Sequence, residues 1–181
     1  MAKINTNTVS MDNETHQMYI DNMDAIVKAD KEWIYNIIDK ISEQESIIYE
    51  NDDIIIMPNL SWKNNNAKDL YLLVIFKDKN LYSIRTLNDT HINMLEQARE
   101  TINEFVEAKF GLTKQNVMMY FHYKPSVWQL HFHVVNIGSQ QIHSNKLPRS
   151  HLLNTVINNI KLKADYYQTA DLEYLKFNKL N

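Results

Sequence analysis

The spacing of apolar residues along the chain predicts three helices. In residues 30–45, apolar side chains recur at helical spacing and would form one stripe facing a core: Trp33, Ile34, Ile37, Ile38 and Ile41. Residues 88–109 give the clearest pattern, with Asn88 placed to cap the start and Gly111 placed to close the end. Residues 151–160 resume the same spacing and predict a shorter helix.

Short apolar runs between these helices predict the strands of a sheet. Residues 47–50 and 54–57 are rich in β-branched side chains and flank an Asn-Asp-Asp turn at 51–53, so we interpret them as a hairpin. Further runs of strand length follow later in the chain: 71–76, 117–121 and 130–137. The run at 71–76 is continuously apolar and predicts a strand buried on both faces.

The order of these elements predicts one domain. Residues 1–24 are polar and aperiodic, so we expect an N-terminal arm that is mobile or docked on a neighbour. Residues 25–181 contain no internal repeat and no linker that would divide them. We therefore expect a single domain of the α+β class, with an antiparallel sheet packed against helices.

Composition narrows the classes of function. The 181 residues are 44% hydrophobic and 23% charged, as in globular proteins, and can bury a substantial core. The absence of cysteine excludes disulfides, thiolate catalysis and cysteine-ligated zinc. A net charge of −3 argues against a partner such as a long nucleic acid. The polar start and the lack of a membrane-length apolar run predict a cytoplasmic or nuclear protein with no membrane partner.

The candidate chemistry lies in residues 121–135. Residues two apart in a strand point to the same face, so Gln129, His131 and His133 would share one surface. Two imidazoles beside His122 and Ser126 are suited to binding a phosphate group and attacking its phosphorus. A neutral imidazole nitrogen is a competent nucleophile, and protonated neighbours offset charge that develops on phosphoryl oxygens.

Spacing alone leaves three other interpretations open. The histidines could be ordinary hydrogen-bonded side chains on a half-solvated strand, with no role in function. They could also bind a nucleotide without catalysis. They could also be metal ligands, since His-x-His occurs in metal sites. Residues 110–162 contain no Asp or Glu, so a carboxylate ligand would have to come from a distant segment.

The sequence around these histidines resembles a known family. Residues 129–135 resemble the histidine-triad motif, with Gln129 in place of its first histidine. The surroundings resemble the catalytic domain of the scavenger mRNA-decapping enzymes. The resemblance covers about residues 25–177 and rests on ordered blocks: 33–40, 47–51, 57–62, 69–72, 122–126, 149–153 and 166–168. It implies the histidine-triad (HIT-like) fold.

The resemblance also implies a reaction. His131 would be the nucleophile that forms a covalent nucleotidyl intermediate, from which water releases 7-methylguanosine monophosphate without a metal or other cofactor. Phosphate contacts would come from four side chains: His122, Ser126, His133 and Arg149. The first triad position orients the nucleophile through its backbone carbonyl, which Gln129 can also supply.

The same resemblance implies a site for the methylated base. Trp33 and Leu60 match the pair that sandwiches the base, and a desolvated cation on an indole gains about 1–2 kcal/mol. Glu50 matches the carboxylate that accepts hydrogen bonds from the guanine edge. Asn59 stands beside the base where the family usually has Asp, so it keeps an acceptor oxygen but loses a charge.

Further departures leave the function open. Ser61 replaces a Lys and Val127 replaces a Tyr, and both changes remove phosphate contacts expected in the family. The family's N-terminal domain, which closes over the substrate, has almost no counterpart in this sequence. Closure, cap selectivity and the permitted length of RNA are therefore in question.

Three functions compete on these grounds. The first is hydrolysis of the cap pyrophosphate in a cap dinucleotide or short capped RNA, which Trp33, Leu60 and Glu50 favour. The second is a histidine-triad hydrolase of wider range, acting on dinucleoside polyphosphates or phosphoramidates. The third is a cap- or nucleotide-binding module with weak or lost turnover. Histidine-triad proteins pair, so we also expect a homodimer, with the helix at 88–109 as a candidate contact.

Overall fold

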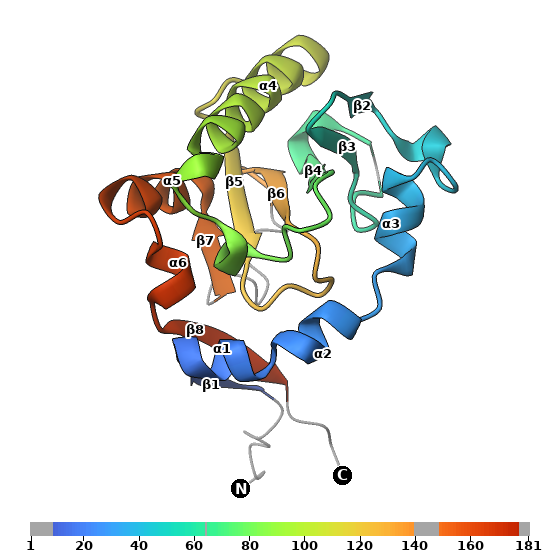
Figure 1. Ribbon diagram of the computed structural model, residues 1–181. Helices are drawn as coiled ribbons and strands as arrows, with labels where there is room; N and C mark the ends of the chain where they lie inside the picture. Colours follow the sequence, from blue (N-terminus) through green and yellow to red (C-terminus); the bar gives the residue numbers. More distant parts are fainter. Residues whose placement is uncertain (1–8, 64, 140–148, 178–181) are drawn as a thin grey trace, which may run out of the picture.

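A computed structural model describes residues 9–63, 65–139 and 149–177. Its centre is an antiparallel six-stranded sheet with the strand order β2-β3-β4-β6-β5-β7. The strands are β2 (Tyr49–Glu50), β3 (Ile54–Pro58), β4 (Tyr71–Phe76), β5 (Val117–His122), β6 (His131–Asn136) and β7 (Ser150–Leu152). Figure 1 shows a separate ribbon below it, in which β1 (Val9–Glu14) pairs with β8 (Leu172–Phe177).

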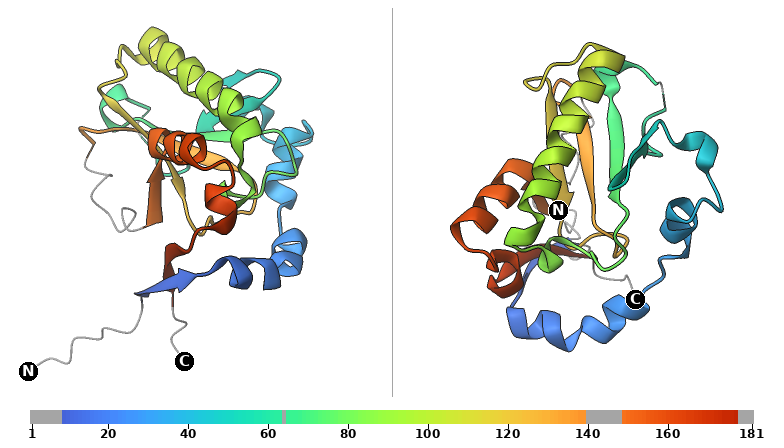
Figure 2. Two further views of the ribbon diagram at one scale, coloured as in Figure 1. Left: turned by 60° about the vertical axis from the view of Figure 1, so that its left-hand side comes forward. Right: turned by 45° about the horizontal axis from the view of Figure 1, so that its top comes forward.

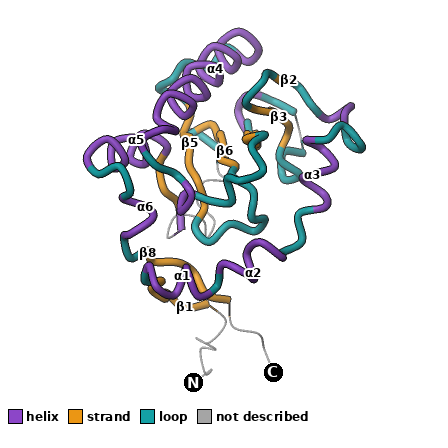
Figure 3. Tube along the Cα trace, viewed as in Figure 1, coloured by secondary structure: helices purple, strands orange, loops and turns teal. Residues whose placement is uncertain are grey.

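Helices pack on both faces of the six-stranded sheet. On one face lie α4 (Ile92–Phe110) and α5 (Leu153–Leu162), and on the other lies α3 (Glu32–Ile38), as two views show (Figure 2). Three shorter helices, α1 (His16–Asp21), α2 (Met23–Lys28) and α6 (Tyr166–Thr169), surround the ribbon end of the molecule (Figure 3). No helix in the described ranges is long and apolar enough to cross a membrane.

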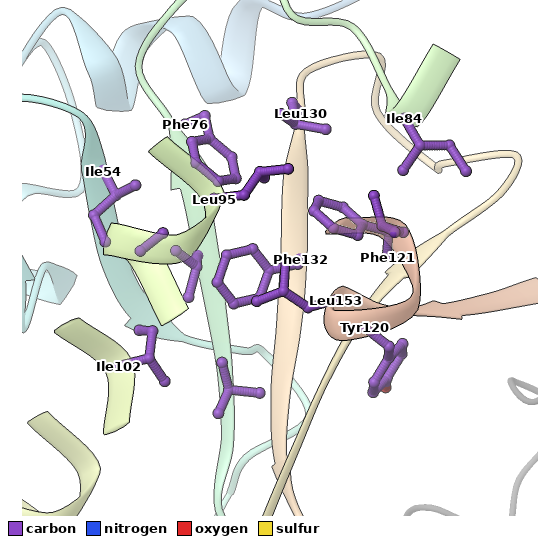
Figure 4. Packing of buried hydrophobic residues seen from close by; sticks show 14 of the residues in the cluster. Ile54, Phe76, Ile84, Leu95, Ile102, Tyr120, Phe121, Leu130, Phe132 and Leu153 are labelled. Atoms are coloured by element: carbon purple, nitrogen blue, oxygen red, sulfur yellow. The ribbon is translucent and has the colours of Figure 1, made fainter. Parts of the chain in front are cut away.

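The alternation of side chains along the strands creates two cores. In β4, Val74 and Phe76 face the large core beneath α4 and α5, whereas Leu73 and Ile75 face a smaller core beneath α3. Figure 4 shows rings from adjacent strands, including Phe76 and Phe132, meeting Leu95 of α4 in the large core. Each such ring contributes about 1.5–3 kcal/mol when fully buried. The large core thus fixes the sheet, and the opposite face of β6 stays available for polar side chains.

The predicted class and most elements are confirmed. The structure is α+β, and the strands expected at 54–57, 71–76, 117–121 and 130–137 are β3, β4, β5 and β6. Asn88 caps a 3₁₀ turn (Asp89–His91) that leads into α4, since its side chain accepts from the Thr90 N–H at 3.0 Å. Gly111 ends α4 at a φ of 65°, a left-handed conformation that glycine adopts without strain.

Two helix predictions need correction. The helix expected at 30–45 ends at Ile38, because Lys40 has a φ of 61°, which a right-handed helix cannot continue. The chain then folds back, and the Ile41 N–H bonds to the Asn36 carbonyl at 2.8 Å. Ile41 is consequently 70% exposed and does not join the predicted stripe. The helix expected from residue 151 begins at Leu153, since the residues before it form β7.

Residues 9–24 are not the aperiodic arm that their composition predicts. They form β1 and α1, and the Thr15 side chain caps α1 by accepting from the Met18 N–H at 3.2 Å. The strand is polar because it lies in a two-stranded ribbon, where both faces need not be apolar. Residues 1–8 lie outside the described ranges, and a domain boundary at residue 24 stays a prediction.

Candidate active site

The strand β6 presents His131 and His133 on the sheet face that α3 covers in part. In the register with β4, His131 lies opposite Ile75 and His133 opposite Leu73. Both partners face the small core, so the two imidazoles point away from α4 and α5. They border a cavity of about 310 Å³ lined by Trp33, Ile34, Met57, Pro58, Asn59, Leu60, Ser61, Leu73, Ser126, Val127, His131 and His133. The predicted shared face of the two histidines is therefore observed.

His131 is held in the orientation that a nucleophile needs. Its Nδ1 lies 2.7 Å from the backbone carbonyl oxygen of Gln129. A carbonyl can only accept, so Nδ1 carries the proton and the Nε2 lone pair of the neutral ring is free to attack. Burial lowers the pKa of His131 below its ordinary value of 6.5, against the opposing effect of the Gln129 hydrogen bond. The ring is therefore neutral at pH 7.

The Gln129 side chain is turned away from the cavity. Its Nε2 donates to the carbonyl oxygens of Phe76 at 2.8 Å and Asp78 at 2.9 Å, and the residue is completely buried. These bonds fasten the start of β6 to the end of β4. The expectation that the Gln129 side chain shares the surface of the histidines is wrong, but its carbonyl occupies the predicted position.

Aromatic groups surround His133. The Tyr71 hydroxyl lies 3.2 Å from its Nδ1, and the Tyr120 ring stacks on it with centroids 5.2 Å apart. The ring centroid of His122 lies 4.4 Å from that of His133. His122 does not line the cavity itself, but this packing places it directly behind a residue that does.

Ser126 and Arg149 complete the phosphate-binding candidates. Ser126 lines the cavity. The backbone carbonyl of Arg149 accepts from the Tyr123 N–H at 2.8 Å, next to His122. The Arg149 charge also contributes to lowering the pKa of His131, which places the guanidinium within electrostatic reach of the nucleophile. A cation at that position can offset the charge of a phosphate bound in the cavity.

Two exposed apolar side chains form the other end of the cavity. Trp33 is 38% exposed and Leu60 is 87% exposed, although apolar side chains of this size are usually buried. Trp33 is therefore not part of the core, in contrast to its neighbour Ile34. Asn59 also lines the cavity, and its Oδ1 accepts from the Ser61 N–H at 3.0 Å. This arrangement suits a flat aromatic ligand.

Glu50 is not brought to this site. Its Oε1 accepts a hydrogen bond from Lys77 at 2.8 Å and lies 3.3 Å from the Lys40 ammonium. The bond from Lys77 is the main reason that the pKa of Glu50 lies below its ordinary value. Glu50 is absent from the cavity lining, so the structure gives no support to its predicted contact with the base.

Sequence reasoning missed Glu43. The indole N–H of Trp33 donates to Glu43 Oε1 at 2.6 Å, so this carboxylate lies at the edge of the proposed base site. Glu43 has a left-handed φ of 55° in the segment after α3. The prediction of an unbroken helix at 30–45 concealed this position, because on that helix Glu43 would lie about 15 Å from Trp33 along the helix axis.

No group of three or more His, Asp or Glu side chains that could hold a metal ion occurs among the residues with described positions. The alternative in which His131 and His133 are metal ligands would need a further ligand, and none of the cavity-lining residues is a carboxylate.

Comparisons with known proteins bear on the family and the fold of this chain. The family model described as "Scavenger mRNA decapping enzyme C-term binding" matches residues 32–147. The chain is 35% identical over 147 residues to the m7GpppX diphosphatase of Ascaris suum, covering 79% of this chain and 48% of that protein. It is 31% identical to the human m7GpppX diphosphatase, covering 79% of this chain and 43% of that protein. The chain thus spans about half the length of the curated relatives it matches.

Among solved structures, the chain resembles Hnt3 in complex with DNA and guanosine, with a TM-score of 0.50 and 14% identity over 74% of this chain and 79% of that one. An aprataxin ortholog, Hnt3 in complex with DNA, also has a TM-score of 0.50, with 18% identity over 69% and 72% of the two chains. At these identities the likeness concerns the fold alone.

Proposed function

The chain belongs to the family of the scavenger mRNA-decapping enzymes, through the C-terminal part of those proteins, and on this premise we propose that its cavity hydrolyses the 7-methylguanosine cap pyrophosphate. The substrate would be a cap dinucleotide or a short capped RNA. The histidine-triad fold expected with this family is confirmed. The observation that carries the proposal is the joint lining of one cavity by a stacking tryptophan and an oriented, neutral histidine, Trp33 and His131.

The chemistry follows from the position of His131. Its Nε2 attacks the phosphorus bonded to the 7-methylguanosine, an N–P bond forms, and the P–O bond to the leaving nucleoside diphosphate breaks. The ring becomes cationic, and its Nδ1–H bond to the Gln129 carbonyl stabilises that charge. Water then attacks the same phosphorus, releases 7-methylguanosine monophosphate and returns the neutral imidazole. Proton balance is kept by loss of one proton to solvent.

The phosphate-binding roles extend this proposal to four side chains. Ser126 and His133 border the cavity and can donate hydrogen bonds to phosphoryl oxygens. Arg149 supplies positive charge near the attacked phosphorus, where negative charge increases in the transition state. His122 packs on His133 and acts through the same cluster. Ser61 and Val127 line the cavity without any charge, so these four groups carry the phosphate contacts.

For the base-binding residues, the proposal differs from the sequence-based prediction at one position. Trp33 and Leu60 enclose the base, with Asn59 beside it. We assign the carboxylate that favours the cationic base to Glu43 rather than Glu50. Glu43 bonds to the stacking indole, whereas Glu50 is already neutralised by two lysines.

A homodimer is the second part of the proposal. The apolar face of α4 packs against the sheet, since Leu95, Ala98 and Ile102 are buried there. Among the described residues, β7 pairs with the second half of β5, and residues 117–119 of β5 border a groove of about 520 Å³ together with Ile137 and Leu152. That groove is a more suitable contact than α4 alone. Analytical ultracentrifugation of the wild type and of Ile137→Glu tests it, since a dimer should dissociate in the variant.

The test of the function uses two substrates. The purified protein is incubated with 7-methylguanosine cap dinucleotide and with the unmethylated dinucleotide, in EDTA, with His131→Asn as the control. Release of 7-methylguanosine monophosphate by the wild type alone, chiefly from the methylated dinucleotide, is the expected result. Binding of both dinucleotides without cleavage would contradict the proposal.

A hydrolase of wider range is the second candidate. Uncharged Asn59, Ser61 and Val127 line the cavity, so fewer groups demand a cationic base or a triphosphate of fixed length. Equal cleavage of the methylated and unmethylated dinucleotides would favour this candidate over the first.

A further inference from the structure

A buried carboxylate from the N-terminal strand contacts the segment that carries the phosphate-binding residues. Glu14, the last residue of β1, is 1% exposed. Its Oε1 lies 2.7 Å from the Lys124 ammonium. Its Oε2 lies 3.3 Å from Arg85 Nη2 and accepts a hydrogen bond from the Tyr123 hydroxyl. Two cations and a hydroxyl therefore satisfy both oxygens.

Arg85 binds the other oxygen of this carboxylate and links Glu14 to the rest of the fold. Its Nη2 also donates to the Glu14 carbonyl at 2.8 Å, and its Nε donates to the Tyr123 hydroxyl at 3.2 Å. Its Nη1 donates to the carbonyl of Tyr167 at 3.0 Å and to that of Ala170. The guanidinium is completely buried, so its place is fixed by five hydrogen bonds rather than by solvent.

Tyr123 joins this network to the active site. Its ring and hydroxyl point to Glu14 and Arg85, while its backbone N–H bonds to the carbonyl of Arg149 at 2.8 Å. Its neighbour in the chain is His122, whose ring packs on His133, and residue 126 lines the cavity. The position of Tyr123 therefore sets the positions of phosphate-binding candidates on both sides of it.

We infer that Glu14 is a positioning residue, which holds residues 122–126 and the Arg149 backbone in place for phosphate through Tyr123, Lys124 and Arg85. This inference rests on the proposed function of the cavity. The polar N-terminal strand is thus part of the machinery of the site, although it contacts no substrate. Glu14 stabilises the bound phosphate indirectly, by limiting the positions that His122 and Ser126 can adopt.

The ribbon does not need Glu14 for its own pairing. The strands β1 and β8 pair along six residues each through their backbones, and Asp12 adds contacts to Tyr174 at 3.2 Å and Lys176 at 3.3 Å. All three side-chain partners of Glu14, in contrast, lie outside the ribbon. A buried charge that only joined two packed elements could be replaced by apolar contact without loss. Two of the three side-chain partners of Glu14 are the adjacent residues 123 and 124, which indicates a role in positioning the segment 122–126.

The experiment compares two ligands that differ by one phosphate. Isothermal titration calorimetry measures the Kd of the full chain for 7-methylguanosine and for 7-methylguanosine monophosphate. The Kd for 7-methylguanosine divided by the Kd for 7-methylguanosine monophosphate reports the contribution of the phosphate site alone. In Glu14→Gln we expect this ratio to fall at least about 10-fold, with a change of less than about 2-fold in the Kd for the nucleoside. The kcat for the cap dinucleotide should fall by a similar factor.

A second variant covers the case in which Glu14→Gln does not fold. Tyr123→Phe removes one hydroxyl and leaves the ion pairs of Glu14 intact. We expect its Kd ratio to fall about 3-fold or more. Two controls separate positioning from stability. Asp12→Asn removes an acid from the same strand, and Ile26→Ala removes buried apolar contact in α2. Both should keep the wild-type ratio, whatever their melting temperatures.

Each outcome decides the inference. Unchanged ratios in the folded Glu14→Gln and Tyr123→Phe variants would overturn it, as would an equal fall in Ile26→Ala. A wild type that binds the monophosphate more tightly than the nucleoside but cleaves no cap would contradict the proposed function only, and the variants would still test Glu14. A wild type with equal Kd values for the two ligands would overturn the inference directly.

Discussion

The indole N–H of Trp33 donates a 2.6 Å hydrogen bond to Glu43 Oε1, which places a carboxylate at the edge of a ring that lines the cavity. A cation stacked on the ring would be attracted by the ring face and by the negative charge at the ring edge. Glu50, by contrast, has its charge offset by Lys77 and Lys40.

Glu43→Gln should weaken the preference for the methylated base. The amide oxygen can still accept from the Trp33 indole, so the variant loses the charge and keeps the ring in place. We expect the ratio of kcat/KM for methylated over unmethylated cap dinucleotide to fall about 5- to 10-fold, equivalent to about 1–1.4 kcal/mol. Glu50→Gln is the matched control and should leave this ratio unchanged. The opposite pattern would return the base-binding role to Glu50.

Asn59→Asp should strengthen the same preference. The new carboxylate keeps the acceptor for the Ser61 N–H and adds a negative charge to the cavity lining. We expect the Kd for 7-methylguanosine monophosphate to fall about 3- to 5-fold at low salt and by less at high salt. Guanosine monophosphate, which has an uncharged base, provides the comparison. An equal gain for both nucleotides would show that Asn59 does not lie beside the base.

Gln129→Met should lower both stability and turnover. The variant fills the space but leaves the carbonyls of Phe76 and Asp78 without their donor. Loss of these buried bonds should cost about 2–4 kcal/mol in the free energy of unfolding. The Gln129 carbonyl would then hold His131 less firmly, and kcat should fall about 10-fold or more. Urea unfolding and steady-state kinetics measure the two effects, and a stable variant with wild-type kcat would contradict this role.

The pKa of His131 predicts how activity depends on pH. Burial lowers this pKa below 6.5, so the neutral nucleophile persists into mildly acidic solution. The acid limb of kcat/KM should therefore have its midpoint below pH 6.5. A midpoint clearly above 6.5 would mean that a different group, or a cationic His131, limits the reaction.

The free energy of unfolding should also depend on the protonation of His131. Since the folded state holds His131 neutral where the unfolded chain is protonated, the unfolded state binds more protons below about pH 6.5. The free energy of unfolding is thus highest above pH 6.5 and falls as pH decreases toward the lowered pKa of the folded state, by up to about 1.4 kcal/mol per pH unit. His131→Asn should reduce this slope in thermal or urea unfolding. An unchanged slope would assign the effect to other groups, such as His151, whose pKa burial also lowers.

Much of this fold could be predicted from residue patterns. The strand at 71–76 is uniformly apolar because it is buried on both faces, and the two faces of β6 follow from simple alternation. The end of α3 could not be predicted, because Lys40 and Glu43 adopt left-handed conformations without a glycine to mark them. This error also hid Glu43 and its bond to Trp33.

The candidate site could also be predicted in part from residue patterns. Strand spacing places His131 and His133 on one face, and that requires only the period of a strand. The burial of Glu14 could not be predicted, because it depends on cations 71 and 110 residues away in the chain, Arg85 and Lys124. Long-range ion pairs of this kind leave no periodic trace in a sequence.

The covalent intermediate on His131 tests the central claim most directly. The protein is mixed with excess 7-methylguanosine cap dinucleotide, quenched in alkali during turnover, digested and analysed by mass spectrometry. The account predicts a 7-methylguanosine monophosphoryl group on the peptide that contains His131, and at least about 1000-fold slower release of 7-methylguanosine monophosphate by His131→Asn. Release at the wild-type rate by His131→Asn, with no adduct on the wild type, would contradict it.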